Sequence, residues 1–386
     1  MSTIFSLPQL TAHDESVVAA IDSIRLELSQ VLRVPQRWQG GLRRSAQAKA
    51  LRGSNSIEGY LVSEDDAVAA VDNEPALSAN EKTWAEILGY RRVLTYVLQV
   101  GATDGFRVDE GLIRAMHFML LEHDLSKTPG HYRIGPVYVM HDDGDVVYTA
   151  PDADVIPDLM DSLVKQANTR HSHPIIRAAM AHLNTVMIHP FRDGNGRMGR
   201  ILQTLVLAMD HVLEPAFASI EEWLGANSED YYSVLAATGA GSWHPERSST
   251  LWTRFNLRAH HMQAQTIHRR FEEADELWTH VDNLVSRYNL PDRTGDALFD
   301  ALLGFRVIRP RYVSHVEVDE RQATRDLTRL SELDLLVAHG HTKGRFYTAG
   351  PPLVDSRDQL RRERRPLKDP YPELMDEIRH QQFTMR

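Results

Sequence analysis

The twelve residues His189–Arg200 constrain this chain more than any other stretch of it, and they read HPFRDGNGRMGR. An apolar helical pattern precedes them, and the apolar run Ile201–Leu207 follows them. This arrangement predicts two buried helices joined by a polar turn that contains glycine. The backbone N–H groups at the start of the second helix would point outward and bind an anion. The stretch therefore predicts a binding or catalytic site held between two rigid elements.

The side chains in this stretch have complementary chemistry. Arg197 and Arg200 lie in the first turns of the second helix, where guanidinium groups would grip phosphate oxygens. Asp193 offers the hard oxygen ligand that Mg²⁺ prefers, and His189 is placed to accept a proton from a hydroxyl group. An ordinary turn with solvated arginines is the alternative, since Asp-Gly and Asn-Gly are common turn signals. Arginine at a helix start opposes the helix dipole, and a bound anion would relieve that conflict.

The order of these residues resembles the Fic family signature, His-x-Phe-x-Asp/Glu-Gly-Asn-Gly-Arg-x-x-Arg, with every fixed position filled. The resemblance implies transfer of AMP from ATP to a Ser, Thr or Tyr hydroxyl of a protein, with release of pyrophosphate. It implies that His189 is the general base, that Asp193 coordinates Mg²⁺ and that Phe191 anchors the loop. Arg197 would support the leaving diphosphate and Arg200 the γ-phosphate. The α- and β-phosphates would be cradled by Gly194, Asn195 and Gly196.

A β-hairpin is predicted upstream of the motif. Residues Pro136–Met140 and Val146–Thr149 are rich in β-branched and aromatic residues, and they flank the Asp-Gly turn of His141–Asp145. The segments that bracket this hairpin resemble those around the Fic flap. The resemblance implies that a target segment docks as an added strand along Val137, Tyr138 and Val139. An exposed hairpin without a role is the alternative.

A second pattern lies near the N-terminus, where Ser54 and Glu58 are four residues apart and share one helical face. Gly59 follows as a plausible helix end. On its own the pattern is weak. It resembles the Fic inhibitory motif Ser/Thr-x-x-x-Glu-Gly/Asn, in the class whose inhibitory helix precedes the core. The resemblance implies that Glu58 pairs with Arg200 and that ATP then binds unproductively.

The resemblance extends to most of the chain and implies a mostly α fold. We expect an N-terminal helical region with the inhibitory helix over 1–105, a Fic-type catalytic core with its hairpin flap over 106–215 and trailing helices over 216–288. Asn227 and Tyr232 resemble the residues that line the adenine pocket, although a tyrosine pair on a helix is also ordinary packing.

The region 289–350 resembles a winged helix-turn-helix, with a recognition helix over Asp319–Leu330 and a β-wing after it. Arg321 and Arg325 on that helix would allow DNA contact. Charges in this region are nearly balanced, which favours a protein–protein or structural role, because DNA-binding domains are usually more basic. Residues 351–386 read as a charged tail.

Composition excludes several classes of protein. The chain has 386 residues, a net charge of −10 and no cysteine, which excludes disulfides and thiol catalysis and argues against a protein that coats nucleic acid. No signal peptide or membrane span is evident, so we expect a cytoplasmic protein without a membrane partner. Spacing excludes a histidine–carboxylate metal motif, so the other histidines are expected to serve packing or the surface.

Three hypotheses follow. The first is an autoinhibited protein adenylyltransferase that uses Mg²⁺ and ATP and acts on a protein hydroxyl, with self-modification expected and a homodimer left open. The second is transfer of UMP, GMP or a phosphoryl group by the same fold. The third is a nucleotide-sensing, DNA-binding regulator, against which the complete set of catalytic residues argues.

Overall fold

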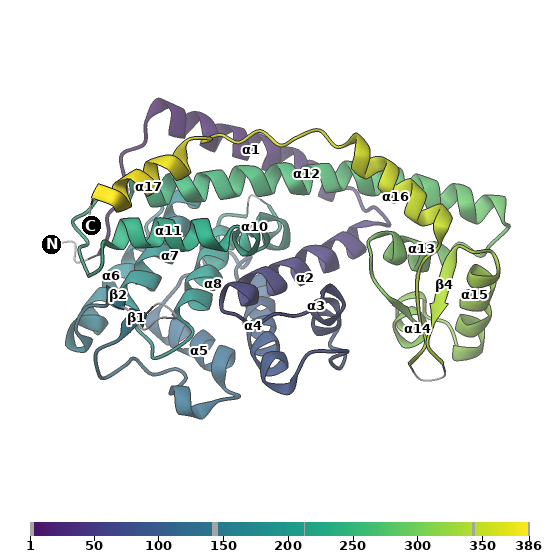
Figure 1. Ribbon diagram of the computed structural model, residues 1–386, viewed down its shortest axis with the longest axis horizontal. Helices are drawn as coiled ribbons and strands as arrows, with labels where there is room; N and C mark the ends of the chain where they lie inside the picture. The colour runs from purple at the N-terminus through teal and green to yellow at the C-terminus, as the bar shows by residue number, and fades with distance from the viewer. Residues whose placement is uncertain (1–3, 141–145, 212, 342–343, 385–386) are drawn as a thin grey trace. The chain divides into compact units, whose positions relative to one another are not determined.

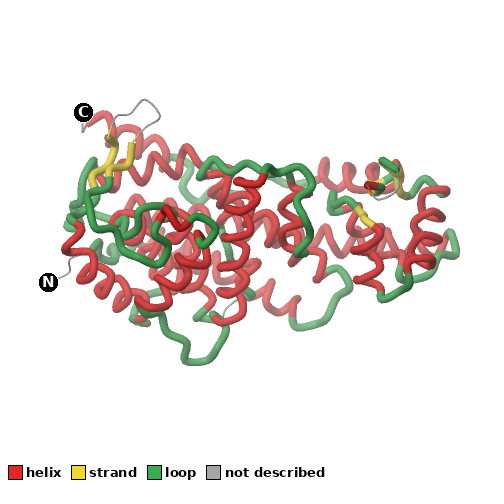
Figure 2. Tube along the Cα trace, turned by 90° about the horizontal axis from the view of Figure 1, so that it is seen from below, coloured by secondary structure: helices red, strands yellow, loops and turns green. Residues whose placement is uncertain are grey.

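The computed structural model describes residues 4–140, 146–211, 213–341 and 344–384. Helices dominate these ranges, and the strands are short (Figure 2). The predicted class, a mostly α fold with a small hairpin, is confirmed. The chain divides into two compact units, one of residues 1–30, 48–265 and 368–386 and one of residues 31–47 and 266–367. The second unit contains the region 289–350 for which a separate domain was expected.

Figure 1 labels most of these elements along the chain. Up to the motif they are α1 (Ala12–Leu32), α2 (Gln39–Ile57), α3 (Glu64–Val71), α4 (Glu81–Val100), α5 (Glu110–Leu121), β1 (Tyr138–Met140), β2 (Val146–Thr149), α6 (Ile156–Asn168) and α7 (Pro174–Ile188). From the motif onward they are α8 (Asn195–Ala208), α9 (Pro215–Ala218), α10 (Glu221–Ala226), α11 (Ser228–Gly239), α12 (Thr250–Arg287), α13 (Thr294–Leu302), β3 (Val307–Ile308), α14 (Arg309–Val316), α15 (Glu320–Glu332), β4 (Leu336–His339), β5 (Phe346–Ala349), α16 (Pro351–Glu363) and α17 (Leu374–Thr384). Two 3₁₀ turns, Leu125–Lys127 and Ala153–Val155, complete the set.

Helices α7 and α8 form the centre of the first unit, where they pack against each other and are buried on nearly every side. Helix α4 packs against both α5 and α8, and α6 packs against α7 (Figure 1). The apolar runs on either side of the motif thus form two helices that are buried over nearly their whole length. This burial holds the turn between them on rigid supports.

The hairpin pairs β1 with β2 in antiparallel register, with Val139 opposite Tyr148 and an irregularity after Val139. The Ala150 N–H donates to the Val137 carbonyl at 3.3 Å. Because alternate residues of a strand face the same neighbour, the backbones of Val137 and Val139 face β2, and that of Tyr138 faces away from it. The turn residues His141–Asp145 lie outside the described part of the chain.

The second unit contains the element order α13, β3, α14, α15, β4, β5. Its three strands form an antiparallel sheet in the order β3-β5-β4. Helix α15 begins at its N-cap Asp319, whose side chain accepts from the Gln322 N–H, and it buries Ala323, Leu327 and Leu330. Strand β3 was not predicted, because two residues carry too little pattern to detect.

The expected charged tail contains two helices that were not predicted, α16 and α17. Leu374 and Ile378 of α17 are buried in the first unit, and the Tyr371 hydroxyl donates to Asp14 at 2.8 Å. Within the described ranges, none of the helices combines the length and apolar character that crossing a bilayer requires.

Candidate active site

Phe191 anchors the motif loop. Its ring is fully buried and stacks on His117, with ring centroids 3.7 Å apart and planes inclined by 7°. The Asn195 side chain folds back on the same residue, accepting from the Phe191 N–H and donating to the Phe191 carbonyl, both at 2.9 Å. The Asn195 amide is therefore a brace for the loop. Its backbone N–H, at the start of α8, would serve the phosphate role that the resemblance implies.

His117 fixes the other end of the loop. Its Nδ1 accepts from the Gly130 N–H at 2.9 Å, so the proton lies on Nε2, which donates to the Asp193 carbonyl at 2.9 Å. Burial lowers the pKa of His117 to about 4, and the ring is therefore neutral at physiological pH. A buried neutral imidazole thus positions the backbone of Asp193.

His189 ends α7 in the left-handed conformation, with φ of 51°, which turns its side chain out of the helix direction. Arg133 holds this bend, donating from Nε to the His189 carbonyl at 2.8 Å and from its backbone N–H to the Pro190 carbonyl at 3.0 Å. The His189 Nδ1 lies 3.2 Å from the Val186 carbonyl. A proton on Nδ1 leaves Nε2 as an acceptor. Burial lowers the pKa of His189, which keeps the ring neutral and ready to act as a base.

Gly194 is the N-cap of α8, and its φ of 78° suits glycine. A Cβ atom at Gly196, the second residue of α8, would lie 2.4 Å from a carboxylate oxygen of Glu58. Glycine at this position therefore permits an anionic group to reach the start of α8. The N–H groups and dipole at a helix N-terminus favour negative charge at such a point.

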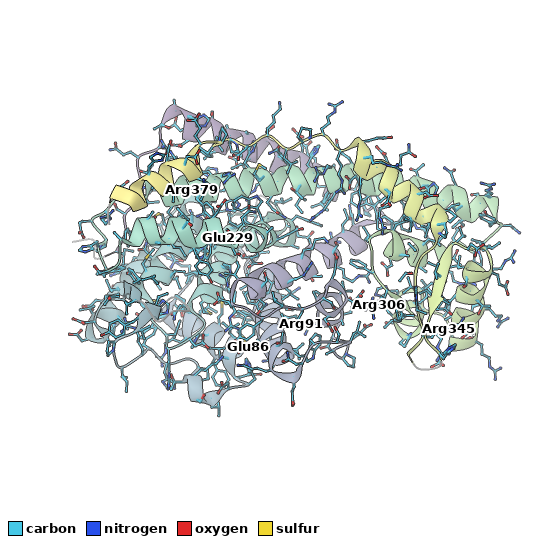
Figure 3. All side chains as sticks on the ribbon, in the orientation of Figure 1. Glu86, Arg91, Glu229, Arg306, Arg345 and Arg379 are labelled. Carbon is cyan, nitrogen blue, oxygen red and sulfur yellow. The ribbon has the colours of Figure 1, made fainter. Side chains whose placement is uncertain are left out.

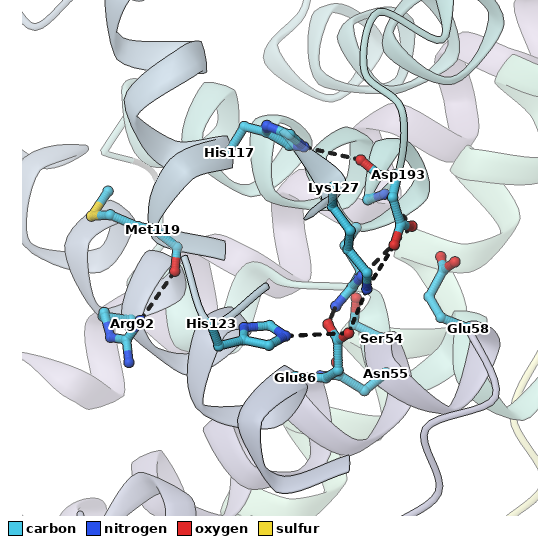
Figure 4. A network of polar contacts seen from close by, with 12 residues as sticks. Ser54, Asn55, Glu58, Glu86, Arg92, His117, Met119, His123, Lys127 and Asp193 are labelled. Atoms are coloured by element: carbon cyan, nitrogen blue, oxygen red, sulfur yellow. Dashed lines mark hydrogen bonds and ion pairs between the residues drawn. The ribbon is translucent and has the colours of Figure 1, made fainter. Parts of the chain in front are cut away.

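Arg197 belongs to a buried network of charges around Glu86. Figure 4 shows Glu86 in this network with Lys127 and His123. Its Nη1 donates to Glu86 of α4 at 2.5 Å, and both side chains are about 1% exposed. Lys127 donates to the other oxygen of Glu86 at 2.7 Å, and His123 lies 3.3 Å from it. Burial alone would raise the pKa of Glu86, but Arg197 and Lys127 hold it at about 2. Glu86 is therefore ionised and fixes the Arg197 guanidinium.

Asp193 remains partly accessible, with 39% of its side chain exposed. Its Oδ1 accepts from the Gly194 N–H at 2.6 Å, and its Oδ2 lies 2.8 Å from Lys127 Nζ. Burial would raise the pKa of Asp193, but Lys127 and Arg197 lower it, so the carboxylate is charged. No cluster of three or more His, Asp or Glu side chains suited to a metal ion occurs among the described residues. A cation here would take one protein carboxylate plus phosphate and water oxygens, an arrangement that suits Mg²⁺.

Arg200 is bound by the predicted inhibitory segment. Its Nε donates to Ser54 Oγ at 2.7 Å, and its Nη2 donates to the Ser54 carbonyl at 3.0 Å and to Glu58 Oε1 at 2.6 Å. Burial would lower the pKa of Arg200, but the Glu58 carboxylate raises it. Helix α2 lies very close to α10, because Gly53 and Gly225 meet without side chains. The structure therefore brings Ser54, Glu58 and Arg200 together as the motif resemblance implies.

Two guanidinium nitrogens in the site have no partner in the described part of the chain. They are Arg197 Nε and Arg200 Nη1, and both are buried. An unsatisfied buried donor on a charged group costs free energy, and a bound anion would relieve that cost. These two atoms give a physical reason to place phosphate oxygens beside α8.

The residues expected to line the adenine pocket hydrogen-bond to backbone carbonyl groups. The Tyr232 hydroxyl donates to the Ile57 carbonyl at 2.8 Å, at the end of α2, and Asn227 donates to the Trp223 carbonyl at 2.7 Å. It is Tyr231 whose ring faces the Arg200 guanidinium, at 6.0 Å. His182, expected to serve packing, is buried and lies 3.0 Å from the Tyr231 hydroxyl.

Sequence reasoning missed the supporting residues Glu86, Lys127, His117 and Arg133. A signal existed for Glu86, since a carboxylate on the apolar face of the helix at 80–100 needs a buried partner. His117 sits in the same way between Met116 and Leu120. Lys127 is the last residue of a short 3₁₀ turn, and no sequence pattern marks it.

The comparison with protein families adds to this geometry. Residues 107–207 match the model of the Fic/DOC family. The chain contains a Fic domain. The sequence is 26% identical over 253 residues to a protein adenylyltransferase Fic of Nematostella vectensis, which covers 62% of this chain and 54% of that protein. It is 31% identical over 144 residues to protein adenylyltransferase fic-1 of Caenorhabditis elegans, covering 37% of this chain and 26% of that protein. The chain thus spans about half or less of these relatives' lengths.

The fold is also similar to solved structures. A Fic family protein from Desulfovibrio desulfuricans G20 aligns with a TM-score of 0.57 and 23% identity over 90% of this chain and 99% of that chain. A C. elegans Fic-1 structure aligns with a TM-score of 0.52 and 20% identity over 67% of this chain and 72% of that chain. At these identities the likeness concerns the fold alone.

Proposed function

We propose that this chain is an autoinhibited protein adenylyltransferase that transfers AMP from ATP to a hydroxyl group of a protein. One observation carries the proposal. A neutral imidazole, an ionised and partly exposed carboxylate and two buried arginines meet at the start of one helix, and each arginine keeps one nitrogen without a partner among the described residues. Relatives of the Fic domain that are named protein adenylyltransferases support the choice of reaction.

In this mechanism His189 Nε2 accepts the proton of the target hydroxyl as its oxygen forms a bond to the α-phosphorus of ATP. The bond between that phosphorus and the bridging oxygen breaks, and pyrophosphate leaves. Arg197 stabilises the leaving charge, and Glu86 and His117 hold the groups around it in place. A Mg²⁺ ion held by Asp193 would neutralise phosphate charge. Arg200 would orient the γ-phosphate and thus the α-phosphorus.

Glu58 supplies the inhibition in this proposal. It occupies one edge of the Arg200 guanidinium, which would hold the γ-phosphate, and it fills the space beside Gly196. Displacing it exchanges one charge-assisted pair for another, so the barrier to release is modest. Whether a nucleotide enters productively then depends on α2.

We propose that the target docks along the outer edge of β1. Tyr138 presents its backbone away from β2 and its side chain is half exposed. An extended segment added there would place its hydroxyl-bearing residue by main-chain hydrogen bonds, without a demand for one sequence. Such docking also suits modification of the protein by itself.

Intact-mass spectrometry tests the proposed reaction. The Glu58→Gly protein is incubated with Mg²⁺ and an equal mixture of ATP, GTP, UTP and CTP, and Glu58→Gly/His189→Ala serves as the inactive control. We expect the mass of one AMP on a Ser, Thr or Tyr residue and none in the control. Addition of UMP, GMP or a phosphoryl group would support the second hypothesis instead.

We also propose that residues 289–350 form a winged-helix module, supported by the element order α13, β3, α14, α15, β4, β5. Arg306 and Arg345, labelled in Figure 3, lie over the rings of Phe346 and Tyr347 in β5. Arg321, Arg325 and Arg329 share the exposed face of α15, and this face keeps DNA contact as a second candidate function.

A gel-shift assay with random-sequence duplex DNA at low salt tests that candidate. A shift that Arg321→Ala/Arg325→Ala abolishes would support it. The absence of any shift would exclude DNA as the partner of this module.

A further inference from the structure

Lys127 contacts two carboxylates of this site. Its ammonium lies 2.8 Å from Asp193 Oδ2 and 2.7 Å from Glu86 Oε1, so it bridges the expected metal ligand and the carboxylate that holds Arg197. Lys127 comes from the 3₁₀ turn after α5, Glu86 from α4 and Asp193 from the motif loop (Figure 4). Three separate elements therefore place one cation directly on Asp193.

We infer that the Lys127 ammonium occupies Asp193 when no nucleotide is bound and so prevents a divalent metal ion alone from binding this carboxylate. A metal ion in complex with a triphosphate would displace Lys127 from Asp193. The inference rests on the proposed function, because that function makes Asp193 the metal ligand. It assigns Lys127 a positioning role that acts through Asp193.

Both oxygens of Asp193 are engaged in the structure, Oδ2 by Lys127 and Oδ1 by the Gly194 N–H at 2.6 Å. A metal ion would bind the same carboxylate at about 2 Å. An ammonium and a divalent cation on one carboxylate repel each other strongly at such distances. A metal ion therefore has to displace Lys127 from Asp193.

Glu86 makes this displacement feasible. It is about 1% exposed, and Lys127 can leave Asp193 without losing this second counter-ion. A buried ammonium without any partner would be strongly disfavoured, whereas one that slides toward Glu86 stays paired. The flexible four-carbon stem of lysine allows such a shift.

The charge of the bound nucleotide determines whether a metal ion can bind beside Asp193. Arg197 Nε and Arg200 Nη1 have no partner among the described residues. Lys127 and Arg197 also place positive charge 2.8 and 4.0 Å from the Asp193 carboxylate. A bare divalent cation adds to that charge, whereas a metal–triphosphate complex is anionic and compensates it. Metal and nucleotide binding should therefore be positively coupled, and Lys127 should set the size of the coupling.

Titration of free Mn²⁺, followed by electron paramagnetic resonance, tests the inference without any need for turnover. The proteins are the wild type, Lys127→Met and Lys127→Gln. The Gln side chain can still donate to Glu86, so this variant serves if Lys127→Met fails to fold. Lys165→Met is the matched control, because it removes the same charge from an exposed pair with Asp161. Each is titrated alone and with α,β-methylene-ATP, which the proposed reaction does not cleave.

We expect both Lys127 variants to bind Mn²⁺ without nucleotide at least ~10-fold more tightly than the wild type. The gain in Mn²⁺ affinity should disappear when Asp193→Asn is added, and Lys165→Met should bind Mn²⁺ as the wild type does. The nucleotide analogue should reduce the difference in Mn²⁺ affinity between the Lys127 variants and the wild type. Nucleotide-free affinities equal to that of the wild type, or a gain that survives Asp193→Asn, would overturn the inference. If either of these results overturns the inference but the protein still transfers AMP, the proposed function stands. If Mn²⁺ binding shows the expected gain but the protein transfers no AMP, only the proposed function is lost.

Discussion

At the scale of single residues, the site depends on which side chains carry a charge. His189 and His117 are neutral because burial lowers the pKa of each, whereas Glu86 is ionised because two cations face it. Each state suits the proposed role: a proton acceptor, a neutral hydrogen-bond donor and a fixed counter-ion. These states follow from burial and neighbours together, which is how active sites commonly tune titratable groups.

His189→Ala should lower AMP transfer at least ~100-fold and leave ATP affinity within a few-fold, because the imidazole acts on the hydroxyl and not on the phosphates. Wild-type activity should fall at low pH, with an apparent pKa below that of an ordinary histidine, since protonation removes the base. Incorporation of labelled AMP and calorimetric ATP binding measure the two effects. Retention of more than about a tenth of the activity would rule out His189 as the base.

Stability should also respond to acid. His117 has a pKa of about 4 in the folded chain, against about 6.5 for an unperturbed histidine. Below about pH 6.5 the unfolded chain binds a proton that the folded chain does not, so this residue's contribution to stability falls as the pH drops toward 4. The loss approaches ~3 kcal/mol for this residue. Urea unfolding at several pH values measures it, and a His117→Gln protein with the same pH slope as the wild type would contradict this account.

At the scale of elements, the predictable parts were those with a long repeating pattern. Helices α4, α7, α8 and α12 follow from apolar residues at helical spacing, and Gly59, with its φ of 81°, follows the end of α2 as expected. Strand β3 is too short to show a pattern. Helix α16 is rich in charged residues and Leu353 is its buried residue, so its sequence lacks a broad apolar face.

The hairpin allows a test of target docking that removes one backbone donor of β1. Tyr138→Pro removes a backbone N–H that faces away from β2, so it should weaken transfer to a protein target and leave ATP binding unchanged. Tyr138→Ala keeps that N–H and is the control for the side chain. A proline at Val139 would instead disturb the pairing with Tyr148. Normal modification of target protein by Tyr138→Pro would show that β1 is not the docking edge.

At the scale of the whole molecule, the first unit collects its site from distant parts of the sequence. Glu86 and Arg197 are 111 residues apart, and Glu58 and Arg200 are 142 apart. The motif resemblance predicted the second pair, because both partners lie in recognisable patterns. Nothing in the sequence predicted the first pair or the bridge through Lys127, since such contacts depend on how α4, α5 and α8 pack together. Local patterns specify the parts of this site, and tertiary packing specifies which charges meet.

The central claim is that one guanidinium, that of Arg200, serves both inhibition and catalysis. The direct test is the rate of labelled AMP incorporation at saturating ATP and Mg²⁺ in the wild type, Glu58→Gly, Arg200→Ala and the double variant. Glu122→Gly is the matched control, because it breaks an exposed pair with Arg92 in the same unit. Glu58→Gly should be ~10-fold or more faster than the wild type if the pair contributes over ~1.4 kcal/mol, and Arg200→Ala should be slow and should cancel that gain. A Glu58→Gly protein no faster than the wild type would contradict the claim.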